Sequence, residues 1–383
     1  MKSEWTKKNL SDIADFNPRE TIKKGAIAKK ISMDVLRPFC RDIPYYVEES
    51  FSGGTKFRNG DTIMARITPC LENGKTAQVS ILNDGEIGFG STEYIVFRAK
   101  EGIADKNYLY YLVCSPEIRE PAIKSMVGSS GRQRVQTDVV KNLELDVPPL
   151  VEQEKIGSFL KAFDDKIALN DRINKNLELQ AESIFKSWFI DFEPFNNQKP
   201  SNWSVSTLGN VSIMGAGGDK PQNISPLKTD LYQYPIYSNG LSNEGLYGFT
   251  NKPKISEESV TVSARGTIGF VCLRHIPYVP IVRLVTLIPQ PQIISAKYLY
   301  LWLKQLHITG TGTTQQQLTV PDFKKTEILV PSQQIVTLFT NTVDPLFEKI
   351  WANQNENEKL SSLRDTLLPK LMSGELDVSA IDI

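Results

Sequence analysis

The chain has 383 residues, of which 40% are hydrophobic and 23% are charged, a composition that is ordinary for a globular protein and excludes a disordered one. At about 100–200 residues per domain, this length predicts two or three domains. The sequence contains no apolar run long enough for a transmembrane helix and no apolar segment behind its first charges. We therefore expect a cytoplasmic protein with no membrane partner.

Basic and acidic residues are equal in number, at 44 each, but they are unevenly distributed. Residues 1–150 hold 22 basic against 20 acidic side chains, and residues 195–331 hold 12 against 7. The remaining segments hold 10 against 17. The two basic blocks permit an anionic ligand such as nucleic acid, although the excess alone does not establish one.

Residues 1–150 predict a mixed α/β domain. β-branched and aromatic residues at 92–97 indicate a strand, and residues 107–113 indicate a short helix. Residues 195–331 show the same pattern, with a strand at 260–263 and a helix at 296–306. Since both blocks mix short strands with short helices, the predicted fold class is α+β.

The two blocks belong to an internal repeat with a period of about 190 residues, which is too long for a solenoid. Trp5 near the start of the chain matches Trp203, and the Tyr-Leu-Tyr at 108–110 recurs at 298–300. Each block ends in a Val-Pro, at 147–148 and at 330–331. The shared order of these matches predicts a duplicated unit of one domain followed by one helix.

The helix of each unit is long. Apolar residues recur at steps of four and three through 152–189 and again through 333–371, which is the spacing of a coiled-coil seam. Pro345 and Arg364 interrupt the second series, and the proline is expected to kink or restart that helix. Each helix could pack on its own domain, but two seams of equal length favour pairing with each other.

Both helices carry two asparagines near their midpoints, which we expect to set the coiled-coil register because a buried asparagine is satisfied only opposite a polar group. An antiparallel pair would place Asn170 opposite Asn357 and Asn174 opposite Asn353, whereas a parallel pair would join Asn170 to Asn353. We favour the antiparallel arrangement. It would give the chain a pseudo-two-fold axis and hold two similar domains at a set separation, as a reader of duplex DNA requires.

Candidate DNA contacts lie in polar loops. Arginine reads guanine, glutamine reads adenine, and glycine lets the backbone approach a phosphate, so the loop at 128–134 and its repeat at 310–317 are the strongest candidates. Isolated basic residues elsewhere are weaker candidates, because each one could equally be a solvated surface charge. The predicted DNA-binding residues are Lys56, Arg58, Arg66, Lys75, Arg132, Gln133, Arg134, Lys252, Lys254, Arg265, Arg274, Arg283, Gln315, Gln316 and Gln317.

Residues suited to catalysis or metal binding are few. The 4 cysteines form no Cys-x-x-Cys pair, and the only histidines are His275 and His307. A zinc site is therefore not expected, and no nucleophile–base pair or carboxylate pair stands out. We predict neither a catalytic residue nor a metal site in this chain.

Several longer passages of the sequence are similar to one protein family. Residues 65–75 with 90–94, and residues 263–269, resemble two kinds of target-recognition domain. Residues 147–156 leading to 184–192 resemble a central conserved region, and residues 363–376 a distal one. Nearly the whole chain thus resembles the specificity (S) subunit of type I restriction-modification systems.

This resemblance implies more than the residues show. It implies target-recognition domains at 1–150 and 195–331, a central conserved helix at 151–194, and a distal conserved helix with a C-terminal tail at 332–383. It implies a non-catalytic subunit that reads one half of a split, asymmetric DNA target with each domain, the coiled coil setting the gap. It also implies docking of two modification (methyltransferase) subunits and, in some systems, of restriction subunits. S-adenosylmethionine, ATP and magnesium would then act on those partners.

Two alternatives to a DNA-reading subunit remain open at this point. One is a self-sufficient nuclease or methyltransferase, against which the lack of catalytic motifs counts. The other is a coiled-coil scaffold whose two domains bind protein. Steeply salt-dependent DNA affinity would separate a DNA reader from a scaffold, because phosphate contacts release counterions.

Overall fold

A computed structural model describes residues 5–310 and 317–378. By its internal contacts the chain divides into two compact units. Unit 1 comprises Met1–Arg172 and Asn353–Ile383, and unit 2 comprises Ile173–Ala352. Each unit therefore contains one half of each long helix. No helix in the described ranges is long and apolar enough to cross a membrane.

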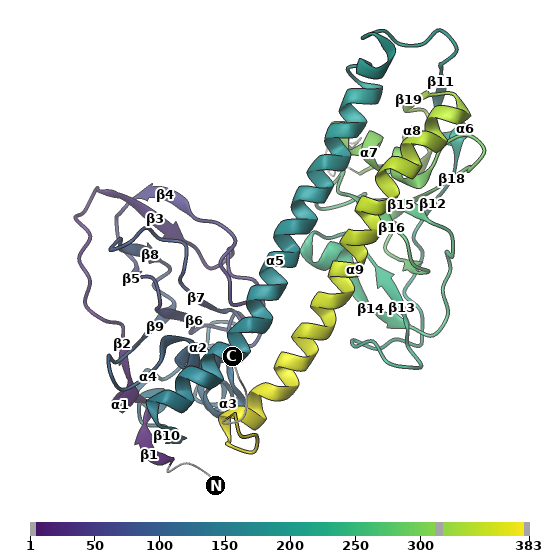
Figure 1. The fold of residues 1–383 in the computed structure, drawn as a ribbon. Helices are drawn as coiled ribbons and strands as arrows, with labels where there is room; N and C mark the ends of the chain where they lie inside the picture. Colours follow the sequence, from purple (N-terminus) through teal and green to yellow (C-terminus); the bar gives the residue numbers. More distant parts are fainter. Residues whose placement is uncertain (1–4, 311–316, 379–383) are drawn as a thin grey trace. The chain divides into compact units, whose positions relative to one another are not determined.

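Unit 1 is built on two four-stranded sheets with short helices beside them (Figure 1). Its strands are β1 (Thr6–Asn9), β2 (Ala14–Phe16), β3 (Ile27–Ile31), β4 (Val47–Ser50), β5 (Thr55–Phe57), β6 (Thr62–Ala65), β7 (Thr76–Gln78), β8 (Gly88–Gly90), β9 (Tyr94–Ala99) and β10 (Glu144–Val147). Its short helices are α1 (Leu10–Ile13), α2 (Lys106–Cys114), α3 (Pro116–Lys124) and α4 (Thr137–Lys141). One sheet has the order β2-β9-β6-β7 and the other β4-β3-β8-β5, while β1 pairs with β10.

Unit 2 has the same plan, with one four-stranded and one three-stranded sheet. Its strands are β11 (Ser204–Thr207), β12 (Ser212–Ala216), β13 (Tyr234–Tyr237), β14 (Leu246–Thr250), β15 (Ser259–Val262), β16 (Val271–Arg274), β17 (Val279–Pro280), β18 (Val285–Pro289) and β19 (Glu327–Val330). Its short helices are η1 (Glu193–Phe195), α6 (Leu208–Val211), η2 (Ser242–Gly245), α7 (Ala296–Gln305) and α8 (Val320–Phe323). The sheet orders are β12-β18-β15-β16 and β14-β13-β17, and β11 pairs with β19.

The internal repeat is confirmed at the level of strand pairing. β1 and β10 pair antiparallel with Thr6 opposite Val147, and β11 and β19 pair antiparallel with Ser204 opposite Val330. One four-stranded sheet in each unit has the same order of equivalent strands, β2-β9-β6-β7 and β12-β18-β15-β16. In the second sheet of each unit one pair is parallel, β3 with β8 and β13 with β17. The predicted α+β class with two mixed domains is therefore confirmed.

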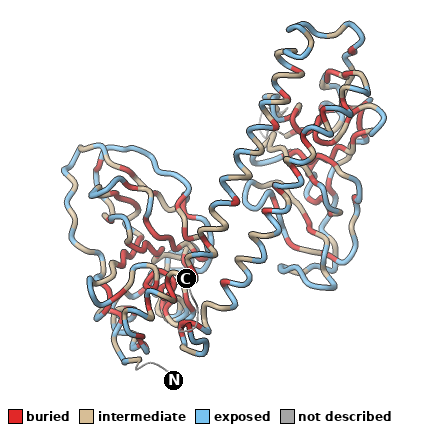
Figure 2. The backbone as a smooth tube through the Cα atoms, viewed as in Figure 1, coloured by how far each residue is buried: buried red, intermediate tan, exposed pale blue. Residues whose placement is uncertain are grey.

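The core of unit 1 consists of two apolar clusters that meet at β9. Ile95 and Phe97 belong to the cluster that contains α2, and Tyr94 and Val96 belong to the other; all four are at most 1% exposed. Asp105 is the N-cap of α2, and its Oδ1 accepts backbone N–H groups of the first turn. Figure 2 shows buried segments gathered inside each unit and an exposed side along both long helices.

The two long helices, α5 (Leu150–Phe189) and α9 (Gln333–Met372), each contain 40 residues. α9 runs on through Pro345, so the expected restart does not occur. A proline removes only one backbone hydrogen bond, and the buried Val343 and Phe347 on either side hold the helix in place.

Within each unit the helices run antiparallel. In unit 1, Asp164 of α5 pairs with Arg364 of α9, and Asn170 pairs with Asn357. The residue number therefore increases along α5 as that of its partner on α9 decreases. In unit 2, Tyr300 of α7 donates to Glu178 of α5 and packs on Phe347 of α9, while Phe185 packs on Phe339. Here too the residue numbers of the contacts increase along α5 and decrease along α9, so the two helices are antiparallel.

Candidate nucleic-acid interface

Three segments of unit 1 meet at the end of β6. The backbone N–H of Arg66 donates to the carbonyl of Glu93 (2.9 Å), and the carbonyl of Arg66 accepts from Val135 (2.9 Å). Beside them, the N–H of Thr68 donates to the carbonyl of Gln133 (3.0 Å). Segments far apart in the sequence, around residues 66, 93 and 134, therefore form one surface, and it includes four of the predicted DNA-binding residues.

The predicted loop at 128–134 is closed at its base like a hairpin. Val127 and Arg134 exchange two backbone hydrogen bonds, of 3.0 Å and 2.8 Å. Gly128 has φ of +134°, a conformation that L side chains rarely adopt, and a Cβ there would lie 3.0 Å from the carbonyl oxygen of Arg132. The closed base fixes the loop, while Arg132 at its tip is exposed.

Arg134 is held by a carboxylate from the facing segment. Its Nε donates to both carboxylate oxygens of Glu93 at 3.0 Å, and its Nη2 donates to Oε1 at 2.6 Å. The hydrogen bond from Arg134 lowers the pKa of Glu93 below its ordinary value, so this carboxyl is ionised near neutral pH. Glu93 is not among the residues that the sequence predicts, because nothing local signals that position 93 faces position 134.

The remaining predicted residues of unit 1 are tied to their own domain. Lys75 Nζ donates to the carbonyl of Met33 (2.8 Å), and Arg58 pairs with Glu20 (2.7 Å). Lys56 Nζ lies 5.2 Å from the centre of the Phe51 ring. Arg134 also has a partner in its own domain, so these contacts do not decide against the three side chains, and their role in binding DNA stays a prediction.

Unit 2 has an equivalent junction at the end of β15. The N–H of Leu318 donates to the carbonyl of Ala264 (3.1 Å), as Val135 does to Arg66 in unit 1. Beside this bond, Arg265 Nη2 donates to Gln317 Oε1 (3.0 Å). Arg265 is exposed, whereas the predicted Gln315 and Gln316 lie outside the described residues.

Among the other predicted residues of unit 2, Lys252, Lys254 and Arg283 are exposed, and Arg274 is not. Arg274 is 3% exposed, and its guanidinium donates to Thr261 Oγ1 (3.0 Å) and to the Glu244 carboxylate (2.8 Å). The structure therefore removes Arg274 from the candidate DNA contacts. Its charge alone suggested a surface position, but its place on the inner face of β16 makes it part of the core.

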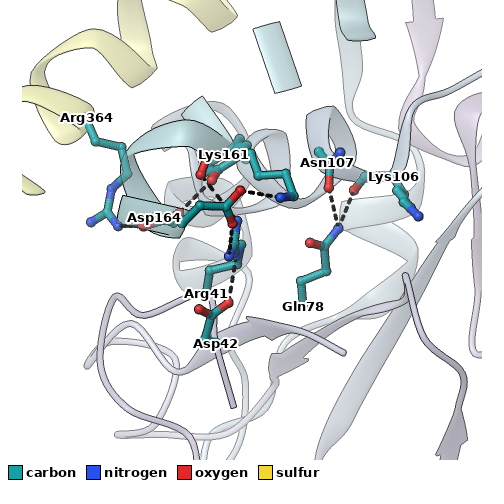
Figure 3. A network of polar contacts seen from close by, with 10 residues as sticks. Arg41, Asp42, Gln78, Lys106, Asn107, Lys161, Asp164 and Arg364 are labelled. Carbon is teal, nitrogen blue, oxygen red and sulfur yellow. Dashed lines mark hydrogen bonds and ion pairs between the residues drawn. The ribbon is translucent and has the colours of Figure 1, made fainter. Parts of the chain in front are cut away.

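A buried polar network ties the helices to the domain in unit 1 (Figure 3). Arg364 of α9 and Asp164 of α5 form an ion pair, with side-chain exposures of 10% and 6%. Asp164 Oδ2 also accepts from the hydroxyl of Tyr111 on α2 (2.6 Å), while Arg41 pairs with Asp165 (2.7 Å). Arg364 thus does not interrupt the seam, because it faces the acid Asp164. An arginine among the apolar residues of a seam indicates an acid on the facing helix.

Polar residues also lie at the centre of the helix pair. Asn170 is 1% exposed, and its Nδ2 donates to Asn357 Oδ1 (2.9 Å) and to Glu356 (2.8 Å). Asn357 in turn donates to Asp171 (2.9 Å). The Asn170–Asn357 bond is the contact expected of antiparallel helices. The role of the four asparagines in setting the register stays a prediction.

Cys114, Cys272 and His275 have shifted pKa values. Burial raises the pKa of Cys114 and of Cys272 to about 12, so both stay thiols at neutral pH. His275 stacks on Trp351 with ring centres 4.0 Å apart, and desolvation at this contact lowers the pKa of the imidazole. Across residues 5–310 and 317–378, no three histidine, cysteine or acidic side chains are grouped to hold a metal ion.

Comparison with known proteins identifies the family of the chain. The family model described as "Type I restriction modification DNA specificity domain" matches the chain twice, over residues 2–179 and 200–362. The chain belongs to this family. It is a type I specificity subunit with two DNA-recognition domains, the non-catalytic part of a restriction-modification system. The two matched segments correspond to the two halves of the internal repeat.

Relatives in this family cover most of the chain. The MjaIX specificity subunit of Methanocaldococcus jannaschii is 29% identical over 320 residues, which is 74% of this chain and 71% of that protein. The HindI specificity subunit of Haemophilus influenzae is 24% identical over 469 aligned positions, covering 98% and 100%. The crystal structure of the S subunit from M. genitalium matches with a TM-score of 0.56 at 17% identity, covering 97% of this chain and 96% of that one, and supports the fold.

Proposed function

We propose that each unit of this specificity subunit reads one half of a split DNA target, through the junction at the end of β6 in unit 1 and of β15 in unit 2. The observation that carries this proposal is that in each junction the loop before the last strand donates a backbone hydrogen bond to the segment after β6 or β15, while the side chains presented there differ. Unit 1 presents Arg132 and an arginine held by a glutamate, and unit 2 presents an arginine held by a glutamine. Because the side chains differ, we expect two unlike half-sites and therefore an asymmetric target.

The chemistry of these side chains suits base edges in the major groove. Arginine donates two parallel hydrogen bonds to O6 and N7 of guanine, and glutamine can pair with adenine. The other exposed candidates, Lys252, Lys254 and Arg283, suit phosphates, which position a protein on DNA without reading its sequence. Gln133 lies at the same junction as Arg134. We propose that Arg132, Gln133 and Arg134 together read the bases in unit 1.

We infer that the two long helices set the gap between the half-sites. Each helix is continuous from one unit into the other, and 40 residues at about 1.5 Å each span about 60 Å. The buried Asn170–Asn357 and Asp164–Arg364 pairs would fix the register, because shifting either helix by one residue would leave these polar groups without partners.

Membership of the family supports a set of partners. We propose that the chain docks two modification subunits, which methylate adenine with S-adenosylmethionine, and that restriction subunits using ATP and magnesium join them in systems that cut DNA. The complex would act in the cytoplasm, where the chromosome lies. The acidic segments at 151–194 and 332–383 are the proposed docking surfaces, since they differ in charge from the DNA-reading blocks.

Replacing Arg132 and Arg134 together with alanine is expected to relax recognition at one half-site only. Each lost bidentate contact should cost about 1–3 kcal/mol of discrimination against the wrong base. Sequencing the duplexes that the full-length variant selects from a random pool measures this directly. An unchanged preference at both half-sites would remove this loop from the proposal, and salt-independent binding by the wild-type chain would argue for a protein scaffold instead.

A further inference from the structure

We propose that Glu93 is a positioning residue: it holds Arg134 so that one edge of the guanidinium stays free to pair with guanine, and it thereby favours sequence discrimination over affinity. This inference rests on the proposed DNA-reading role of unit 1. It assigns a specificity function to an acidic residue that neither charge nor sequence pattern marks as a DNA contact.

The guanidinium of Arg134 can pair with acceptors along more than one edge. Arginine has five N–H groups arranged as a fork, and Glu93 occupies the edge formed by Nε and Nη2. The opposite end of the fork, formed by Nη1 and the second N–H of Nη2, has only a long contact of 3.5 Å from Nη1 to the carbonyl of Arg132. That end carries two parallel donors, the pattern that O6 and N7 of guanine accept.

Both partners are held by their backbones. The N–H of Glu93 donates to the Ser91 hydroxyl (3.1 Å), and its carbonyl accepts from Arg66. Arg134 is fixed by its two backbone bonds to Val127. A free arginine side chain loses about 2 kcal/mol of rotamer entropy when it is ordered. Because Arg134 is already ordered in the free protein, much of this loss does not occur on binding DNA.

The position of the pair suits contact with DNA. The side chain of Arg134 is 46% exposed and that of Glu93 is 24% exposed, so the arginine extends further into solvent than the acid that holds it. An ionised carboxylate beside a phosphate-binding surface repels the DNA backbone, so Glu93 should weaken non-specific binding. A negative charge at position 93 would not be expected if the residue served only to increase the affinity for DNA.

Unit 2 also has an arginine with a side-chain partner at its junction, but this arginine comes from a different segment. Arg265 follows β15, as Arg66 follows β6, and its Nη2 donates to Gln317 Oε1 (3.0 Å). Arg265 is therefore not the counterpart of Arg134, and the inference about Glu93 rests on the contacts of unit 1.

The test compares Glu93→Ala, Arg134→Ala and the double variant in the full-length chain. Glu120→Ala is the matched control, because Glu120 is an exposed acid of the same unit that pairs with Lys124 at 3.3 Å. Binding is measured with a random-sequence duplex at several salt concentrations, and base preference by sequencing the duplexes selected from a random pool.

For Glu93→Ala we expect tighter binding to the random duplex, a salt slope steeper by about 1, and a discrimination about tenfold lower at one base pair. Arg134→Ala should relax the same base pair, and the double variant should relax it no further. The control should show none of these changes. A purely structural role for Glu93 would lower stability without changing which base is preferred.

The outcomes separate this inference from the function it rests on. If Arg134→Ala relaxes one base pair but Glu93→Ala leaves discrimination intact, the positioning role is refuted and the proposed function stands. If Glu93→Ala relaxes a different base pair, Glu93 reads a base itself and the inference is again refuted. If the wild-type chain selects no sequence at all, the proposed function fails first.

Discussion

Replacing Arg364 with alanine is expected to lower the free energy of unfolding of unit 1 by about 3–5 kcal/mol, because removing one partner leaves a buried charge uncompensated. Asp164, with a side-chain exposure of 6%, would keep only the hydroxyl of Tyr111 as a partner. Urea unfolding followed by tryptophan fluorescence measures the loss. Hydrogen exchange should show it first in residues 353–372 and in α2.

Two further variants make this result specific. Lys359→Ala, an exposed change on the same helix, should alter stability by less than about 0.5 kcal/mol. The double variant Asp164→Asn with Arg364→Met should recover much of the loss, since replacing both charges removes the uncompensated ion. A loss below about 1 kcal/mol for Arg364→Ala would mean that this pair is hydrated and does not tie α9 to unit 1.

Adding one heptad to both long helices is expected to lengthen the gap in the recognised target by about three base pairs. Seven residues extend a helix by about 10.5 Å, and each base pair of B-form DNA adds about 3.4 Å. The insertions belong after Arg172 in α5 and after Ala352 in α9, the points at which the chain passes between its units. A whole heptad preserves the phase of the seam on both sides.

The measurement for the heptad variant is its selected target sequence. Both half-sites should be unchanged, with only the gap between them longer. An insertion in α5 alone is the control, and it should weaken binding because the α5–α9 contacts of the two units, such as Asn170–Asn357 and Phe185–Phe339, can then no longer form together. An unchanged gap in the double insertion would mean that the helices do not set the spacing.

Much of the architecture could be predicted from the pattern of residue types along the sequence. Matches such as Trp5 with Trp203 predicted a duplicated unit, and the paired strands β1–β10 and β11–β19 confirm it. The seam periodicity predicted two long helices because a 3.5-residue repeat is a local property of the sequence. The strand orders within the sheets could not be predicted, since they depend on pairings between distant segments.

The candidate site was less predictable, and for a physical reason. Whether a basic residue is a surface charge or part of the core depends on what faces it, and Arg274 and Arg364 are both buried against acids that lie far away in the sequence. Glu93 was missed in the same way, because its partner Arg134 lies 41 residues further on. Composition locates basic segments, but only the fold shows which acid faces each arginine.

The most direct test of the central proposal is the target sequence of the wild-type chain, read as adenine methylation across a genome in cells that express it with its modification subunits. The account predicts two short, unlike half-sites separated by a gap of one fixed length. A single continuous motif, a palindrome, or half-sites at variable spacing would contradict it.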